Sequence, residues 1–454
     1  MKQKKNNSQN SSSPLLTVRG LETRFETGGQ SVRAVDGVDF TIQSGETFAL
    51  LGESGCGKSV TSLSIMRLVP EPAGRIAAGA VLLHDQDLLQ LTELQMRNVR
   101  GRRIAMIFQE PMTSLNPVLP IGRQITETVL RHSTSAGSQA KARSLELLDA
   151  VGIPDPARRY HEYPHQLSGG MKQRVMIAVA LAGDPELLIA DEPTTALDVT
   201  IQAQVLDLLR KLQKETGMAI LLISPDLGVI SEMADQVAVM YAGQIVETAS
   251  RDQFFNAPQH PYSQKLFDSL PDRSRRDQGL AVIKGSVPSL AQEFTGCRFE
   301  PRCDYGQDIC RNQIPPWHAG QQDCGIRCHL PDRLQQGPVA PPRTSAKAGG
   351  KKSFAPDHGP ANKPKNILHV DGLKVHFPIR KGLFKRTVGF VKAVDDLSLE
   401  IPRGKTLALV GESGSGKTTA GKGILHLIRP TAGRVKLEDI QLTDLRPREL
   451  RTKR

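Results

Sequence analysis

Residues 52–59 constrain the fold of this 454-residue chain more than any other part of its sequence. They read GESGCGKS, which matches the pattern G-x-x-x-x-G-K-S, and they lie between an apolar run, 48–51, and a helical pattern, 60–68. In this strand–loop–helix context, main-chain amides surround a phosphate, Lys58 reaches the β- and γ-phosphates, and the Ser59 hydroxyl ligates Mg²⁺. The sequence therefore predicts a nucleoside triphosphate site. Its residues are Gly52, Glu53, Ser54, Gly55, Cys56, Gly57, Lys58 and Ser59.

A second stretch, 167–198, supplies the acidic residues that such a site needs. The apolar run 187–190 ends in Asp191 and Glu192, which predicts a buried central strand with carboxylates at its C-terminal end. Ligands bind at that end of an open parallel sheet. We therefore expect Asp191 to hold Mg²⁺ and Glu192 to polarise a water molecule.

Two glycines begin the helical part of the same stretch. Ser168-Gly169-Gly170 precedes the helical run 171–181, and a further amphipathic helix is expected over 201–214. Free amides and the positive end of the dipole at a helix N-terminus favour an anion. The order of these pieces and the phosphate loop indicates one nucleotide-hydrolysing unit.

These motifs together resemble the ATP-binding cassette (ABC) family. LSGGMKQRV, from Leu167, is similar to its signature, residues 187–192 to its Walker B strand, and residues 195–198 to its D-loop. IFQEPMTSLNP at 107–117 resembles the Q-loop segment of the dipeptide, oligopeptide, nickel and glutathione importers. APQHPYSQKL at 257–266 resembles the C-terminal extension of that subfamily.

The resemblance implies an ATPase with ATP and Mg²⁺ as cofactors. It implies that Glu192 is the general base, that Phe25 stacks on adenine, and that Gln109, with Ser59 and Asp191, contacts Mg²⁺ and couples it to a permease. Four residues would contact ATP held by a partner cassette: Ser168, Gly169, Gly170 and Asp198. The implied partners are two integral-membrane permeases, a periplasmic solute-binding protein and a second cassette, from a homodimer or a separate subunit, at the cytoplasmic face of the inner membrane.

The expected fold is α/β: a P-loop core sheet with an antiparallel β subdomain and a helical subdomain. Residues 16–25 and 34–42 alternate like strands of an antiparallel edge sheet, and the pattern turns helical from 92 to about 165. The expected domains are a disordered basic tail (1–14), a nucleotide-binding domain (15–270), a Cys-rich extension (271–330), a Pro/Gly/Lys-rich linker (331–366) and a partial second cassette (367–454).

Composition excludes some classes and leaves others open. No apolar run approaches the roughly 18–20 residues of a membrane span. Residues 1–14 lack the apolar region of a secretory signal. The net charge of +12 fits nucleic-acid binding, an anionic membrane surface or a generally basic proteome. No long basic stripe with interleaved aromatics occurs, so charge alone does not decide between these readings. We expect no nucleic-acid partner because cassette ATPases that act on nucleic acids lack the SLNP segment and the Cys-rich tail.

The extension contains four cysteines that are candidate metal ligands: Cys297, Cys303, Cys310 and Cys328. Their spacing, C-x5-C-x6-C-x17-C, fits no standard zinc finger. The flanks GCRFEPRC and Cys-His resemble the tail of peptide-importer ATPases, some of which carry a [4Fe–4S] cluster, and four thiolates suit one. Zinc and simple burial as apolar side chains are the alternatives.

The last part of the chain repeats the first. Residues 392–395 repeat 33–36, and residues 411–418 repeat the phosphate loop, which predicts a duplicated nucleotide-binding unit. This arrangement resembles fused two-cassette importer ATPases. Residues 442–445 align with 91–94, and the sequence stops before a second Q-loop. The expected phosphate- and adenine-binding residues of the second copy are Phe377, Gly411, Gly414, Gly416, Lys417 and Thr418.

One departure from the family pattern affects the first copy. The apolar strand 219–224 should be followed by a histidine and an aspartate, but Pro225 and Asp226 follow it. The sequence therefore predicts a peptide-class importer ATPase, for di- or oligopeptides or glutathione, whose hydrolysis is impaired. A catalytically impaired remnant or regulatory binding protein is the alternative. A cassette ATPase of translation or DNA repair would lack the SLNP segment and the cysteines.

Overall fold

A computed structural model describes residues 13–110, 114–132, 137–194, 198–270, 282–320, 324–330, 366–381, 386–412 and 414–452. The chain forms two compact units. The first comprises Met1–Leu197 and Ile201–Thr344, and the second comprises Asp198–Thr200 and Ser345–Arg454. Residues 1–12 of the expected tail and 331–365 of the expected linker lie outside the described residues.

The first unit is built on a mixed eight-stranded sheet with the order β11-β12-β10-β9-β3-β8-β7-β6. The strands are β3 (Thr47–Leu51), β6 (Ile104–Ile107), β7 (Leu187–Asp191), β8 (Ala219–Ile223), β9 (Gln236–Tyr241), β10 (Gln244–Ser250), β11 (Trp317–Ala319) and β12 (Gly325–Arg327). Strands β9, β3, β8, β7 and β6 are parallel, and β10, β12 and β11 continue antiparallel.

The central strands are buried on both faces, as continuous apolar runs predict. In β7, Leu187 and Ile189 pack into one core with the antiparallel sheet. Leu188 and Ala190 point to the other face and pack with the helices. The strand therefore cannot move without disturbing two cores, and the acids at its end are held firmly.

A second, antiparallel sheet has the order β2-β1-β4-β5. Its strands are β1 (Leu16–Thr27), β2 (Gln30–Ile42), β4 (Gly74–Leu83) and β5 (Gln86–Asp87). The predicted strands at 16–25 and 34–42 are both confirmed, and each is longer than predicted.

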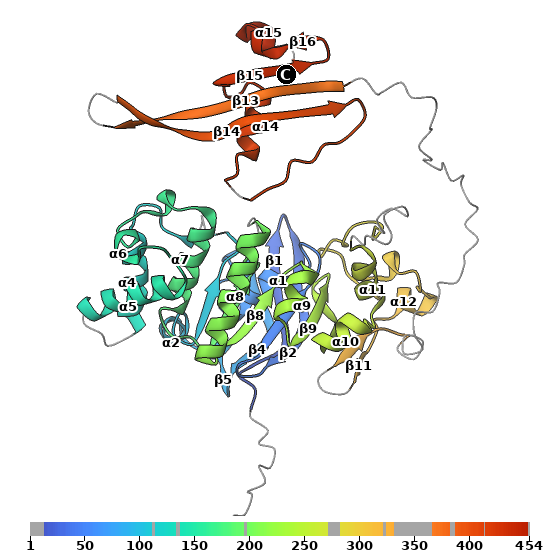
Figure 1. Cartoon of the computed structure of the whole chain (residues 1–454). Helices are drawn as coiled ribbons and strands as arrows, with labels where there is room; N and C mark the ends of the chain where they lie inside the picture. Colours follow the sequence, from blue (N-terminus) through green and yellow to red (C-terminus); the bar gives the residue numbers. More distant parts are fainter. Residues whose placement is uncertain are drawn as a thin grey trace, which may run out of the picture. The chain divides into compact units, whose positions relative to one another are not determined.

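Some helices cover the faces of the central sheet, and others lie beyond its two edges. Helices α4–α7 lie beyond the β6 edge and α10–α12 beyond the opposite edge (Figure 1). Their bounds are α1 (Lys58–Ile65), α2 (Glu93–Val99), α4 (Ile121–His132), α5 (Gly137–Ala150), α6 (Pro156–Arg159), α7 (Gly169–Leu181), α8 (Val199–Thr216), α9 (Leu227–Met233), α10 (Arg251–Asn256), α11 (Pro261–Asp268) and α12 (Asp308–Asn312). Single 3₁₀ turns are η1 (Leu88–Gln90), η2 (Pro164–Gln166) and η4 (Glu300–Arg302).

The expectation of an all-helical segment from 92 to 165 is wrong in one place. Residues Ile104–Ile107 form β6, which pairs in parallel with β7 at the edge of the central sheet. Four apolar residues are too few to distinguish a strand from a buried helical turn by periodicity. No helix among the described residues is long and apolar enough to span a membrane.

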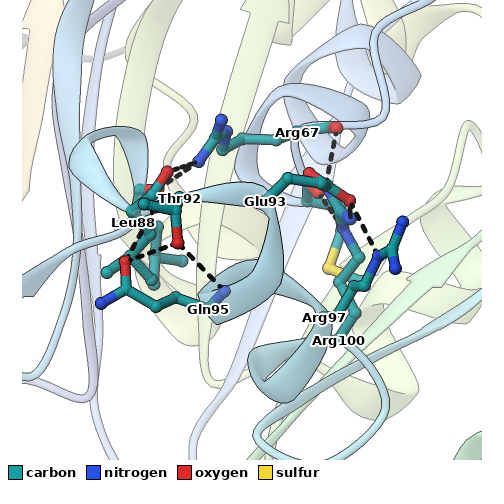
Figure 2. A network of polar contacts seen from close by, with 9 residues as sticks. Arg67, Leu88, Thr92, Glu93, Gln95, Arg97 and Arg100 are labelled. Carbon is teal, nitrogen blue, oxygen red and sulfur yellow. Dashed lines mark hydrogen bonds and ion pairs between the residues drawn. The ribbon is translucent and has the colours of Figure 1, made fainter.

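A polar network ties α2 to the end of α1, the helix that follows the phosphate loop (Figure 2). Thr92 and Gln95 form a capping box at the start of α2. At its end, Arg100 donates to Glu93 at 2.6 Å and to the carbonyl of Arg67 at 3.0 Å. Satisfying the carbonyls after α1 fixes where that helix ends.

The second unit repeats the antiparallel sheet, with the order β14-β13-β15-β16. It contains β13 (Asn366–Lys381), β14 (Arg386–Pro402), β15 (Ala432–Leu437), β16 (Ile440–Gln441), α14 (Lys417–Ile424), η5 (Leu442–Asp444) and α15 (Pro447–Arg451). Here η5 and α15 follow β16 as η1 and α2 follow β5. The structural counterpart of Leu442 is therefore Leu88, not Leu91, and the predicted alignment of 442–445 with 91–94 is wrong by three residues.

The counterpart of β3 in the second unit is not a strand. Residues 405–410 have no regular structure, and Val410 is 84% exposed, whereas β3 is fully buried. Strand β3 is held by parallel neighbours, β8 and β9. Among the described residues of the second unit no strand offers such pairing. Without a neighbouring strand the main-chain groups of such a run have no ladder partner, and residues 405–410 are exposed.

We expect deletion of residues 367–454 to leave the ATP affinity of the first unit within about threefold, below about 1 kcal/mol. The reason is that the first unit contains its own loop, acids and complete central sheet. Equilibrium binding of ATP to the full and shortened chains checks this. A tenfold loss on deletion would show that the second unit contributes to the site.

Candidate nucleotide site

The phosphate loop joins β3 to α1, and two of its glycines are required by close approach. A Cβ at Gly57, whose φ is 111°, would lie 2.3 Å from the carbonyl oxygen of Ala34. A Cβ at Gly52 would lie 2.2 Å from the carbonyl oxygen of Met240. Neither position accepts a side chain. The loop is therefore packed tightly between β2 and β9, with the N-terminus of α1 behind it.

Lys58 is the first residue of α1 and is almost fully buried. Its ammonium donates to the carbonyl oxygens of Gly52 at 2.8 Å and Glu53 at 3.0 Å. A buried ammonium needs such partners. These contacts place a positive charge inside the curve of the loop, where phosphate oxygens would compete for it.

The side chain of Ser59, the last residue of the phosphate loop, contacts that of Asp191. The Ser59 hydroxyl donates to a carboxylate oxygen of Asp191 at 3.1 Å, at the C-terminal end of β7. Burial raises the pKa of Asp191, and the hydrogen bond from Ser59 opposes that rise. Paired oxygen donors of this kind are what Mg²⁺ prefers, so the residues present fit the metal that the family implies.

Gln109 and Glu192 also meet, from the segments after β6 and β7. The Gln109 amide donates to Glu192 at 2.7 Å. Glu192 has a left-handed backbone (φ 49°), and its N–H donates to the carbonyl of Ile223 at 2.9 Å. Strained backbone of this kind persists where the surroundings over-determine it, which is frequent at functional sites. Gln109 and Glu192, which were predicted from two separate motifs, therefore form one polar cluster.

The signature helix contributes a residue that sequence reasoning missed. Gln173 of α7 is buried, and its amide donates to the carbonyl of Pro193 at 2.5 Å, one residue after Glu192. Ser168 caps the same helix by accepting from Met171 at 3.4 Å. A glutamine among buried apolar positions of a helix was the available signal. The bond links α7 to the residue that follows Glu192.

The segment after β8 faces a cavity beside the loop. This cavity, of about 420 Å³, is lined by Gly52, Glu53, Pro225 and Asp226, with Leu266 of α11 and two residues that follow that helix. Pro225 is exposed, and Ser224 before it is buried. The Ser224 hydroxyl accepts from the N–H of Asp226 at 3.0 Å, a contact within this turn.

Other predicted residues lie as follows. Phe25 is half-buried on β1, and its ring fills the space beside Gly74. Asp198 lies just before α8, while 195–197 of the expected D-loop fall outside the described residues.

In the second unit, Lys417 donates to the carbonyl of Gly411 at 2.7 Å, the same contact that Lys58 makes, but in an exposed loop. No acidic counterpart of Asp191 occurs in the described part of that unit.

The four candidate cysteines come together although they are far apart in sequence. Cys297, Cys303, Cys310 and Cys328 line one cavity of about 20 Å³, the size of one water molecule. Burial raises the pKa of Cys297 to about 11 and that of Cys303 to about 12, so both are neutral thiols at pH 7. Among the described residues, no three Cys, His, Asp or Glu side chains are arranged to bind one metal ion.

Comparison with known proteins places the chain in a family. The family model "ABC transporter" matches residues 35–195 and 394–454. The probable peptide ABC transporter ATP-binding protein y4tR of Sinorhizobium fredii is 53% identical over 312 residues, which are 67% of this chain and 93% of that protein. The oligopeptide transport ATP-binding protein AppD of Bacillus subtilis is 52% identical over 318 residues, 70% and 97% of the two chains. The chain belongs to the ATP-binding proteins of ABC transporters.

Two further matches concern parts of this ABC ATPase. The model "Oligopeptide/dipeptide transporter, C-terminal region" matches residues 246–310, which include α10, α11 and three of the clustered cysteines. A dimeric ATP-binding cassette in a post-hydrolysis state with ADP and Pi is 26% identical, covering 52% of this chain and 98% of that chain at a TM-score of 0.48. The predictions of the family, of the α/β cassette fold and of ATPase activity are confirmed.

Proposed function

We propose that this ABC ATPase is the energising subunit of a peptide importer at the cytoplasmic face of a bacterial inner membrane. Its expected partners are two permease subunits, a periplasmic solute-binding protein and a second cassette. The observation that carries the proposal is the convergence of Lys58, the Ser59–Asp191 pair and the Gln109–Glu192 pair around one loop. The match of residues 246–310 to the peptide-transporter C-terminal region supports peptides as the cargo.

Each residue has a chemical role in this proposal. Lys58 exchanges its carbonyl partners for the β- and γ-phosphates, and Ser59 and Asp191 hold Mg²⁺. The bound metal neutralises charge on the phosphates. Glu192 takes the proton of the attacking water as the P–O bond to ADP breaks. Gln109 fixes the Glu192 carboxylate by a hydrogen bond and couples the Mg²⁺ site to a permease.

The remaining site residues act between cassettes. Ser168, Gly169 and Gly170 at the start of α7 present main-chain amides to ATP held by a partner cassette, with Asp198 beside them. Phe25 stacks on the adenine. In the second unit, Phe377, Gly411, Gly414, Gly416, Lys417 and Thr418 hold phosphate and adenine without hydrolysing ATP.

Uptake of a radiolabelled oligopeptide tests the function. Cells lacking the gene for this chain are complemented with the unmodified chain or with Lys58→Ala. We expect the unmodified chain to restore uptake and Lys58→Ala to restore none. Equal uptake in both complemented strains would contradict an ATP-driven role.

A slow or regulatory ATPase is the second candidate, favoured by Pro225. The cavity beside the loop is lined there by a side chain without any hydrogen-bond donor. In this form the chain binds Mg–ATP and closes against its partner, but releases phosphate slowly.

We also propose that the four clustered cysteines hold a [4Fe–4S] cluster. Four thiols from distant positions lining one cavity support it, and four thiolates are the usual ligand set. The cavity has room for about one water molecule, so the side chains must turn outward, and the raised pKa values mean that binding releases protons.

We expect protein purified without oxygen to be brown, to contain iron and sulfide, and to lose both in the Cys303→Ser variant. Cys324→Ser is the matched control, because the Cys324 thiol contacts Gln253 at 3.1 Å and does not line the cavity. Iron and sulfide analysis with an absorption spectrum checks this. Colourless protein that contains only zinc would show the cluster proposal to be wrong.

A further inference from the structure

The second residue of the phosphate loop, Glu53, is held by residues more than 200 positions later. The hydroxyl of Tyr262, on α11, accepts from the Glu53 N–H at 3.0 Å. Arg302, in the turn η4, donates through both terminal nitrogens to the Glu53 carboxylate, at 2.9 and 3.2 Å. Both the main chain and the side chain of Glu53 are therefore fixed by the C-terminal region.

Arg302 is itself held rigidly. Its side chain is only 6% exposed, and its Nε donates to the carbonyl of Lys284 at 2.9 Å. Its Nη1 also donates to the hydroxyl of Tyr241 at 3.3 Å, and the ring of Tyr241 packs on that of Tyr262 at 4.7 Å. A planar guanidinium with fixed partners gives a pre-organised, two-point contact with a carboxylate.

Two features of the loop make this contact relevant to ATP. First, Glu53 places a negative charge within the segment that must bind a polyanion, and Arg302 offsets that charge. Second, Lys58 now donates to the carbonyls of Gly52 and Glu53. When Lys58 turns to phosphate oxygens, the loop loses these contacts. Tyr262 and Arg302 then remain to keep the Glu53 main chain in place.

We propose that Arg302 and Tyr262 are positioning residues for ATP, acting through Glu53. This rests on the proposed role of the loop in binding Mg–ATP. The C-terminal region thus forms part of the nucleotide site through its contacts with Glu53. Small misplacements of such a loop have large effects, on the order of a hundredfold in rate for about 1 Å.

The test is the affinity of the full-length chain for Mg–ATP in the Arg302→Met variant. Methionine fills similar space without charge. We expect Arg302→Met to weaken ATP binding about tenfold, because it leaves the Glu53 carboxylate uncompensated beside the phosphates. Adding Glu53→Gln should then restore affinity to within about threefold of the unmodified chain. A purely structural role of Arg302 predicts no such rescue.

Arg311→Met is the matched control, since Arg311 lies in the same region and pairs with Glu300 on the surface at 2.8 Å. Its ATP affinity should not change. If Arg302→Met does not fold, Tyr262→Phe takes its place; it removes one hydroxyl and should weaken binding about threefold. Unchanged affinity in a folded variant, or no rescue by Glu53→Gln, would overturn the positioning proposal alone. Failure of the unmodified chain to bind ATP would overturn the proposed function as well.

Discussion

Replacing Pro225 by histidine should raise the ATP turnover of the full-length chain about a hundred- to a thousandfold at unchanged ATP affinity. The groups that we propose to bind the ground state, Lys58, Ser59 and Asp191, are in place. What the segment after β8 lacks is a donor toward the γ-phosphate, where charge shifts as the bond breaks. Removing one pre-organised donor costs about 3–4 kcal/mol in the transition state.

Neighbouring groups do not replace that donor. Proline has no side-chain donor and no N–H. The Ser224 side chain is buried and accepts the N–H of Asp226, and the Asp226 carboxylate accepts the N–H of Gly228 at 2.7 Å as the cap of α9. The Ser224 hydroxyl keeps its own proton to donate, but Ser224 does not line the cavity that Pro225 and Asp226 line. A carboxylate only accepts hydrogen bonds, so Asp226 supplies no donor.

Pro225→Ala is the matched control, because it restores the main-chain N–H without adding a ring donor. We expect turnover of the alanine variant to stay within about tenfold of the unmodified chain, far below the gain from histidine. Steady-state phosphate release and equilibrium ATP binding, measured on the same samples, separate the two effects. If the unmodified chain already turns over as fast as the histidine variant, the proposed cause of slow hydrolysis is wrong.

The second large effect is expected from Glu192→Gln, which should lower turnover about a hundred- to ten-thousandfold, the usual contribution of a general base. Glutamine keeps an oxygen for the Gln109 amide but cannot take a proton. ATP affinity should be unchanged. The measurement is best made with Pro225→His present, where the starting rate is high.

Glu186→Gln is the control for this experiment. Glu186 immediately precedes β7, at the other end of the strand from Glu192, and pairs there with Arg103 at 2.8 Å. We expect its turnover to match that of the parent. Turnover that survives Glu192→Gln would show that another group accepts the proton of the attacking water.

Sequence reasoning located what is encoded in contiguous residues. The loop 52–59, the acids after β7 and the first two strands follow from spacing and periodicity, and the structure brings Ser59 to Asp191 and Gln109 to Glu192 as the motifs predict. Boundaries and short runs were less accurate, as at β6.

The contacts that sequence reasoning missed join distant positions. Gln173 reaches Pro193, and Arg302 reaches Glu53 across 249 residues. Arg302 does not differ from an ordinary surface polar residue in a local pattern, and the one local signal for Gln173 was its place among apolar positions of a helix. The Arg302 contact depends on how β9, α11 and η4 pack together, and the Gln173 contact depends on how α7 packs against the segment after β7. Periodicity contains no information about that packing. Residues 405–410 give another example. Their apolar pattern repeats that of β3, but they form no strand because no strand in the described part of the second unit pairs with them.

The chain contains two phosphate loops, and the central claim is that the first alone forms a hydrolytic site. The most direct test is phosphate release by full-length Lys58→Ala and Lys417→Ala, the same substitution in each loop. We predict that Lys58→Ala abolishes turnover and that Lys417→Ala leaves it within about threefold. Equal losses in both variants, or a loss confined to Lys417→Ala, would contradict this account.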